Sequence, residues 1–215
     1  MGYNSQQWFS RIANRSDITS GVTHLTKPSR NIEQLTDEDE INKLATENLI
    51  QILKDRVIRG STTKTGFIVG ETPAVCFQDV PFYSLIQNIE HERQRRSANS
   101  NERYRYCGVG LVFKKPYIFS RGGRPVFYEQ TKIAKKLLPE DQYWRIVNFD
   151  ISDANEIIDW THEREWRLPK ELKFELKKTH ILLYNTICWK FFIGNCPKEI
   201  FQEIAGVTIL QNLIM

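Results

Sequence analysis

The 215-residue sequence contains no long hydrophobic run. Its longest apolar stretches, "ILLY" at 181–184 and "FFIG" at 191–194, have the length of strands, whereas a helix that spans a bilayer needs about 20 apolar residues. The first residues, "MGYNSQQWFSRIANRSDI", also lack the apolar centre of a secretion signal. We therefore expect no membrane segment and a cytoplasmic location.

Cysteine is scarce and irregularly spaced. The four cysteines, Cys76, Cys107, Cys188 and Cys196, form no C-x-x-C pair, so the sequence predicts free buried thiols and no zinc site. His162 and Glu165 have the H-x-x-E spacing of a helical metal pair, but no second histidine cluster lies near them. We predict no metal.

Several familiar catalytic motifs are missing. The sequence has neither G-x-x-x-x-G-K-S/T nor G-x-G-x-x-G, the loops that cradle phosphates, and it has no G-x-S-x-G nucleophile elbow. It also has no internal repeat and no linker rich in proline, glycine and serine. These absences favour one domain that is neither a P-loop enzyme nor a doubly wound nucleotide-binding fold.

Charge of one sign is not in large excess, since 30 basic residues face 26 acidic ones and the net charge is +4. The basic residues do concentrate in "HERQRRSANSNERYRY" at 91–106. Such a stretch contacts phosphates in some proteins and is a solvated loop in others. Composition alone leaves both interpretations open.

The hydrophobic pattern predicts helices in the first half of the chain and strands in the second. Thr36 as N-cap, four acids at 37–40 and apolar residues at helical spacing predict a helix that ends near Arg56, and a second helix is expected at 82–95. Strands are expected at 22–26, 73–77, 107–113, 124–128, 145–149, 165–168, 180–184, 190–194 and 206–210, with further helices at 132–138 and 198–204. This order is typical of an α+β fold with a mixed or mainly antiparallel sheet flanked by helices.

The segment "DWTHEREWRLP" at 159–169 has the highest density of reactive groups. In an extended strand, Glu163 and Glu165 would lie on one face roughly 7 Å apart, and two like charges at that distance raise each other's pKa. An edge strand with a solvated polar face is the alternative interpretation.

Four short motifs follow one another in the order "THLTK", "NLIQILKDRVIRGS", "AVCFQD" and "EREWRLP". This order of strand with histidine, helix, strand and late glutamate resembles the ADP-ribosyltransferase superfamily, particularly the branch of poly-ADP-ribose polymerases and DarT-type toxins. With "RGGRPVFYE", the chain is also similar to AbiGi-type abortive-phage-resistance proteins of bacteria. The resemblance covers 23–169 and implies an ADP-ribosyltransferase-like split sheet.

The resemblance implies roles for individual residues. Glu165 corresponds to the catalytic glutamate, and Glu163 to the preceding acid of an E-x-E pair. His24, followed by Thr26, corresponds to the histidine that binds the ribose of NAD. Phe77 would lie near the aromatic residue that stacks on nicotinamide, with Tyr83 as a substitute for the tyrosine that is usual there. A first-strand histidine together with an E-x-E pair combines two branches, which leaves the acceptor of ADP-ribose undetermined.

The chemistry supplies a reason for these residue types. Cleavage of the nicotinamide–ribose bond passes through an oxocarbenium-like state, which a carboxylate near the ribose stabilises, and a second carboxylate can deprotonate the acceptor. Arg121, Arg124 and Arg167 are candidates to hold the pyrophosphate, and ordinary surface charge is the alternative for each. The "GG" at 122–123 allows either close approach to a ligand or a hairpin turn.

The sequence therefore predicts one domain, with an N-terminal extension at 1–21, a core at 22–169 and C-terminal strands and a helix at 170–215. The expected function is that of an NAD-dependent toxin or phage-defence effector that modifies a nucleic acid or protein and has a cognate antitoxin. Two alternatives stay open. One is a non-catalytic defence or antitoxin module that binds protein or nucleic acid through 93–105. The other is a small nuclease that uses Glu175 and Lys177 of "FELKK".

Overall fold

The computed structural model describes residues 2–29, 37–98 and 105–214. Helices and strands are mixed along this part of the chain, and the strands pair in both directions. The predicted combination of helices with mixed and antiparallel sheets is thereby confirmed. No helix in the described ranges is both long and apolar enough to cross a membrane.

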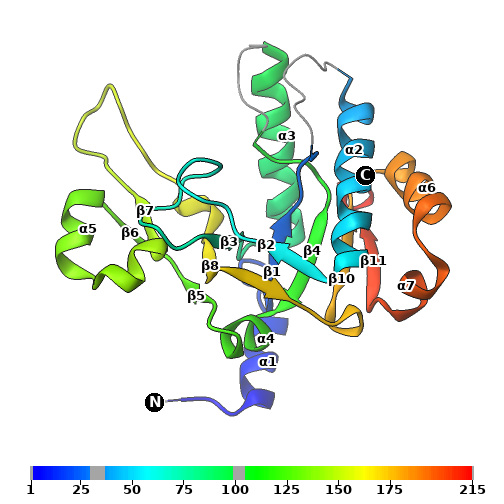
Figure 1. The fold of residues 1–215 in the computed structure, drawn as a ribbon, viewed down its shortest axis with the longest axis horizontal. Helices are drawn as coiled ribbons and strands as arrows, with labels where there is room; N and C mark the ends of the chain where they lie inside the picture. The colour runs from blue at the N-terminus through cyan, green and yellow to red at the C-terminus, as the bar shows by residue number, and fades with distance from the viewer. Residues whose placement is uncertain (1, 30–36, 99–104, 215) are drawn as a thin grey trace.

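The largest sheet joins strands from both ends of the chain (Figure 1). Its order is β1 (Gly21–Leu25), β4 (Gly110–Lys114), β10 (His180–Leu183) and β11 (Gly206–Ile209). Strand β4 runs antiparallel to both of its neighbours, β1 and β10, and β11 is parallel to β10. Because β10 is an inner strand and its residues 181–183 are fully buried, this sheet is covered on both faces.

A second sheet places the two predicted site strands next to each other. It consists of β3 (Ala74–Phe77), β8 (Trp166–Pro169) and β5 (Arg124–Pro125), with β8 in the middle and all pairs antiparallel. One backbone bridge connects it to the larger sheet: Thr23 and Gln78 exchange N–H···O bonds of 2.9 and 2.8 Å. The end of β3 therefore lies beside β1.

Two small sheets complete the strand pairing. Strand β2 (Val57–Arg59) pairs antiparallel with β9 (Glu171–Lys173), and β6 (Phe127–Glu129) pairs parallel with β7 (Ile146–Asn148). Figure 1 shows β6, β7 and α5 (Thr131–Leu137) extending away from the larger sheet.

Helix α2 (Glu38–Asp55) forms where the acidic cluster and apolar spacing predict it. Its N-cap is Asp37, whose carboxylate accepts from the backbone N–H of Asp39 and Glu40. The predicted cap, Thr36, lies outside the described residues. The face that packs into the protein carries Ile41, Asn42, Ala45, Thr46, Leu49, Ile50 and Leu53.

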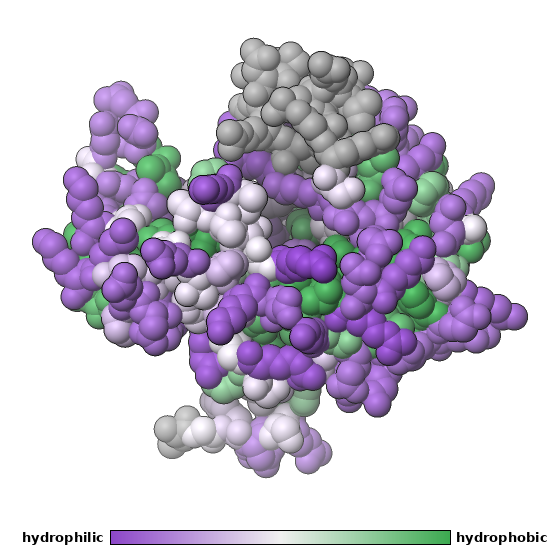
Figure 2. Space-filling view, viewed as in Figure 1, coloured by the Kyte–Doolittle hydropathy of each residue, from purple (hydrophilic) through white to green (hydrophobic). Residues whose placement is uncertain are grey.

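The remaining helices differ in how deeply they are buried. Figure 1 shows α3 (Phe82–Ala98) running alongside α2, with α6 (Thr186–Asn195) and α7 (Lys198–Glu203) on the other side of α2. Helix α4 (Lys115–Ser120) follows β4 directly. Helix α1 (Ser5–Ala13) has no buried residue. Hydrophilic residues cover most of the face seen in Figure 2.

Two expectations of secondary structure are wrong. Residues 190–194, predicted as a strand, belong to α6, because Asn185 caps the helix and Cys188 and Phe192 are buried one turn apart. The predicted strand at 124–128 is split into β5 and β6, which belong to different sheets. Of the two interpretations of the glycines at 122–123, the hairpin turn does not form, because they follow the end of α4 with Gly122 at φ 94°.

One main hydrophobic core runs through the described chain. It extends from Val22 in β1 to Leu210 after β11, and it includes residues 181–183 of β10. The segment 170–215 therefore contributes an inner strand and part of the core, together with the predicted core region at 22–169.

Candidate functional site

The side chain of His24 connects the two sheets. Its Nδ1 lies 2.9 Å from the carbonyl oxygen of Cys76 in β3. Because a carbonyl oxygen only accepts, Nδ1 carries the proton and Nε2 is left as an acceptor. Burial lowers the pKa of His24 and outweighs the opposing effect of this hydrogen bond. His24 is therefore a neutral imidazole held in one tautomer.

Cys76 connects His24 to the predicted catalytic strand. It is paired with Arg167 across β3 and β8, and burial raises the pKa of its thiol well above the usual value. The neighbouring Glu165 carboxylate raises the pKa of the thiol further. His24 and Glu165, which lie far apart in the sequence, thus both adjoin Cys76.

Glu165 is buried, and its charge is compensated by Arg167. The Arg167 guanidinium donates from Nε to Oε1 at 2.8 Å and from Nη2 to Oε2 at 3.2 Å, and both side chains are less than a tenth exposed. The other guanidinium N–H groups donate to the backbone carbonyls of Phe67, Trp144 and Ile146. Arg167 has no donor left for a pyrophosphate, contrary to its expected role.

Glu163 occupies a different environment two residues earlier. The expected strand alternation is wrong here, because Glu163 ends the 3-10 helix η2 (Thr161–Glu163) and Arg164 adopts a left-handed conformation with φ 46°. Strand β8 begins only at Trp166. The two carboxylates are therefore not on one face of a strand.

The Glu163 carboxylate accepts a hydrogen bond from the Tyr106 hydroxyl. Burial and the Glu165 charge raise the pKa of Glu163 to about 7, although the Tyr106 hydrogen bond and the charges of Arg167 and Lys27 act in the opposite direction. A carboxyl group with this pKa exchanges protons near neutral pH, which suits a general base or acid.

Other predicted cofactor-binding residues are distributed differently. The ring of Phe77 is 1% exposed and lies edge-on between His24 and Phe113, so it has no face open to nicotinamide, contrary to expectation. Tyr83, on the first turn of α3, is 57% exposed. Thr26 is buried beside β1, and its hydroxyl has no hydrogen-bond partner among the described residues.

Two predicted arginines already have partners at the end of α4. Arg121 lies 3.6 Å above the ring of Tyr117 and forms an ion pair with Glu175 at 3.6 Å. Arg124 donates to the backbone carbonyls of Phe119 and Gly123. These guanidinium groups contact neither His24 nor Glu163, so the structure does not unite them with the predicted NAD residues.

The acid and lysine of "FELKK" form a local ion pair. Glu175 lies 3.3 Å from Lys177 in addition to its contact with Arg121. No group of three or more histidine, cysteine, aspartate or glutamate residues in the described ranges is arranged to hold a metal ion.

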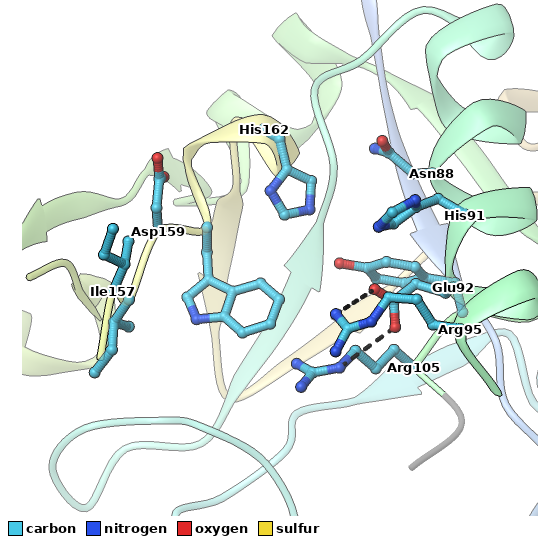
Figure 3. A pocket seen from close by; sticks show the side chains of 11 residues that line it. Asn88, His91, Glu92, Arg95, Arg105, Ile157, Asp159 and His162 are labelled. Atoms are coloured by element: carbon cyan, nitrogen blue, oxygen red, sulfur yellow. Dashed lines mark ion pairs between the residues drawn. The ribbon is translucent and has the colours of Figure 1, made fainter. Parts of the chain in front are cut away.

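A cavity of about 520 Å³ opens beside Tyr106, whose hydroxyl contacts Glu163. One wall is the face of α3 with Asn88, His91, Glu92 and Arg95, and the opposite wall is the segment 157–162 (Figure 3). Arg105 and Tyr106 also line it. Because the hydroxyl of Tyr106 donates to Glu163, the ionisable carboxyl group lies directly behind the cavity wall.

These cavity residues carried only weak signals in the sequence. Arg105 and Tyr106 belong to the basic stretch that was interpreted as either a phosphate contact or a loop, and Trp160 and His162 belong to "DWTHEREWRLP". The ring centroids of Trp160 and His162 lie 5.9 Å apart. The aromatic residues interspersed among the basic ones were the available signal, but the side on which they gather depends on how α3 packs.

The arrangement thus combines a neutral histidine, a buried Glu165–Arg167 pair and an ionisable Glu163 that contacts Tyr106 in the cavity wall. It can orient a hydroxyl group at His24 Nε2 and move a proton at Glu163. No protein-family model, curated protein or solved structure matches this chain.

Proposed function

We propose that this protein is an NAD-dependent ADP-ribosyltransferase-like toxin or phage-defence effector that cleaves the nicotinamide–ribose bond. The observation that carries the proposal is that His24 contacts the backbone carbonyl of Cys76 while the Glu165 and Glu163 carboxylates act on its thiol. The same residues carried the resemblance in the sequence. Carboxylates near one point suit glycosidic chemistry.

The environments of the two glutamates assign the steps. Glu165 is held by two hydrogen bonds from Arg167, so it fixes the local geometry and charge as a positioning residue. Glu163 deprotonates the acceptor hydroxyl or water, which attacks the ribose carbon as the bonding electron pair leaves with nicotinamide. His24 accepts a hydrogen bond from a ribose hydroxyl at Nε2. The catalytic role expected for Glu165 thereby passes to Glu163.

Release of nicotinamide from NAD by the purified protein tests this proposal, in the presence of DNA, RNA and protein acceptors. We expect Glu163→Gln to reduce the rate by about a hundredfold or more, since general base catalysis contributes roughly that factor. The wild-type rate should rise with pH through about 7, as Glu163 becomes ionised. Glu199→Gln on α7 is the matched control and should leave the rate unchanged. A rate at background with every acceptor would refute the proposal.

The second candidate is a non-catalytic module that binds protein or nucleic acid. It is favoured by the position of Arg95 and Arg105 in the cavity, next to Trp160. Arginine beside an exposed aromatic ring is common at nucleic-acid and protein interfaces. Toxicity on expression separates the two candidates, because Glu163→Gln abolishes it only if the protein acts as an enzyme.

A further inference from the structure

The cavity between α3 and the segment 157–162 has apolar groups on one wall and polar groups on both (Figure 3). The 157–162 wall contributes Ile157, Ile158 and the ring of Trp160, together with Asp159 and His162. The α3 wall contributes the amide of Asn88, the imidazole of His91 and the charged pair Glu92 and Arg95. A ligand with a flat apolar part and a polar or charged part fits this lining.

Arg105 joins the two walls. Its guanidinium carbon lies 4.5 Å from the centre of the Trp160 ring, and its Nε lies 3.4 Å from the Glu92 carboxylate. A guanidinium on an aromatic face extends the stacking surface, and nucleobases stack on both kinds of group. The Trp160–Arg105 pair is thus a ready platform for a planar heterocycle.

Glu92 occupies the position that suits an anionic ligand group. It forms ion pairs with Arg95 at 3.8 Å and with Arg105 at 3.4 Å, both longer than the roughly 2.7–2.9 Å of a tight charge-assisted hydrogen bond. A phosphate offers more acceptor oxygens than a carboxylate and matches the planar fork of arginine. It can therefore take over the contact of Arg105 with Glu92, and His91 lies on the same wall.

We propose that this cavity binds a nucleoside 5′-monophosphate, with the base on Trp160 and Arg105 and the phosphate between Arg105 and the α3 wall. The volume of about 520 Å³ is in the range of small-ligand sites and accommodates one nucleotide. Binding needs neither His24 nor the proton of Glu163. Nucleotide binding in this cavity can therefore be tested independently of NAD cleavage.

Calorimetric titration of the full-length protein with AMP and with UMP tests the proposal, with adenosine and inorganic phosphate as partial ligands. We expect both nucleotides to bind and each partial ligand to bind at least about tenfold more weakly, because each lacks one of the two contacts. Competition with NAD identifies the source of the nucleotide. Displacement of AMP by NAD assigns the site to the adenylate half of the dinucleotide, and its absence assigns it to a free nucleotide.

Three variants locate the site. Arg105→Gln and Trp160→Leu should each weaken AMP binding by about tenfold or more, whereas Glu92→Gln should strengthen it several-fold by removing the competing carboxylate. Arg11→Gln is the matched control, because Arg11 also lies over an aromatic ring, that of Tyr3, but on α1 outside this cavity. Circular dichroism shows whether each variant is folded.

Three results would overturn the proposal. One is the absence of heat with AMP and UMP at millimolar concentration, whether or not the protein releases nicotinamide. A second is binding that none of the cavity variants changes by more than the control does. Phosphate that binds as tightly as AMP would also overturn it, since the aromatic wall would then contribute nothing.

Discussion

Two glutamates two positions apart have opposite environments in this protein. The charge of Glu165 is compensated by a buried arginine that donates two hydrogen bonds to it. Glu163 accepts a hydrogen bond from the Tyr106 hydroxyl, and it lies close enough to Glu165 for the two negative charges to repel each other. Because burying a carboxylate is unfavourable unless a cation compensates it, the pKa of Glu163 is raised to about 7.

The raised pKa of Glu163 predicts how stability changes with pH. Between its ordinary pKa of 4.5 and about 7, the folded state holds a proton on Glu163 that the unfolded chain has lost. The free energy of unfolding should therefore fall as pH rises through this window, by up to about 3 kcal/mol from this group. Urea unfolding at pH 4, 6 and 8 measures it.

The same series on Glu163→Gln isolates this contribution, because the amide has no proton to lose and can still accept from Tyr106. The variant should gain stability relative to wild type as pH rises. Parallel pH curves for the two proteins would contradict the assignment.

The Glu165–Arg167 pair predicts a large effect of removing one partner. Arg167→Met leaves a buried carboxylate without its cation and should destabilise the protein by about 3–5 kcal/mol, measured by urea unfolding. Adding Glu165→Gln to this variant should recover part of the loss. The control Arg56→Met breaks an exposed pair with Glu203 and should cost less than about 1 kcal/mol. Equal costs for the two arginines would contradict the buried-pair account.

At the scale of elements, most helices and strands lie where the hydrophobic period predicts them. The failures have local causes. The apolar run at 190–194 has no polar alternation, so periodicity does not distinguish a strand from a buried helix there, and the Asn185 cap decides for the helix. The 3-10 turn that ends at Glu163 depends on a left-handed Arg164, for which the sequence offers no glycine or asparagine signal.

The cap of α6 makes a prediction at this scale. The Asn185 side chain accepts from the N–H groups of Ile187 and Cys188 at 3.1 and 3.0 Å and donates to Asp39 on α2 at 2.9 Å. Asn185→Ala should therefore cost about 1–2 kcal/mol in thermal or urea unfolding.

Asn4→Ala is its matched control. Asn4 caps α1, a helix without buried residues, so fraying of α1 is expected to leave the global transition within about 0.5 kcal/mol of wild type. If both substitutions lower the free energy of unfolding equally, the prediction that the Asn185 cap matters more, because α6 is packed against α2, is wrong.

At the scale of the whole molecule, the segment 170–215 supplies two of the four strands of the largest sheet. Strand β10 lies between β4 and β11, and its three apolar residues are fully buried. A chain cut to residues 22–169 exposes both the edge of β4 and the core behind it. We expect this fragment to lack the dispersed amide resonances of a folded protein in an NMR spectrum. A chain that begins at residue 14, without α1, should keep them, and a folded 22–169 fragment would contradict the single-core account.

The sequence by itself determined the mixture of helices and strands and the concentration of chemistry in "DWTHEREWRLP", because these follow from residue type and local spacing. It also singled out His24 and Glu165, which contact the backbone carbonyl and the thiol of Cys76 respectively. Only the tertiary structure decided which glutamate is compensated by arginine. Burial and charge pairing depend on residues distant in sequence, so Tyr106, Arg167 and the α3 wall acquire their roles only when the chain folds.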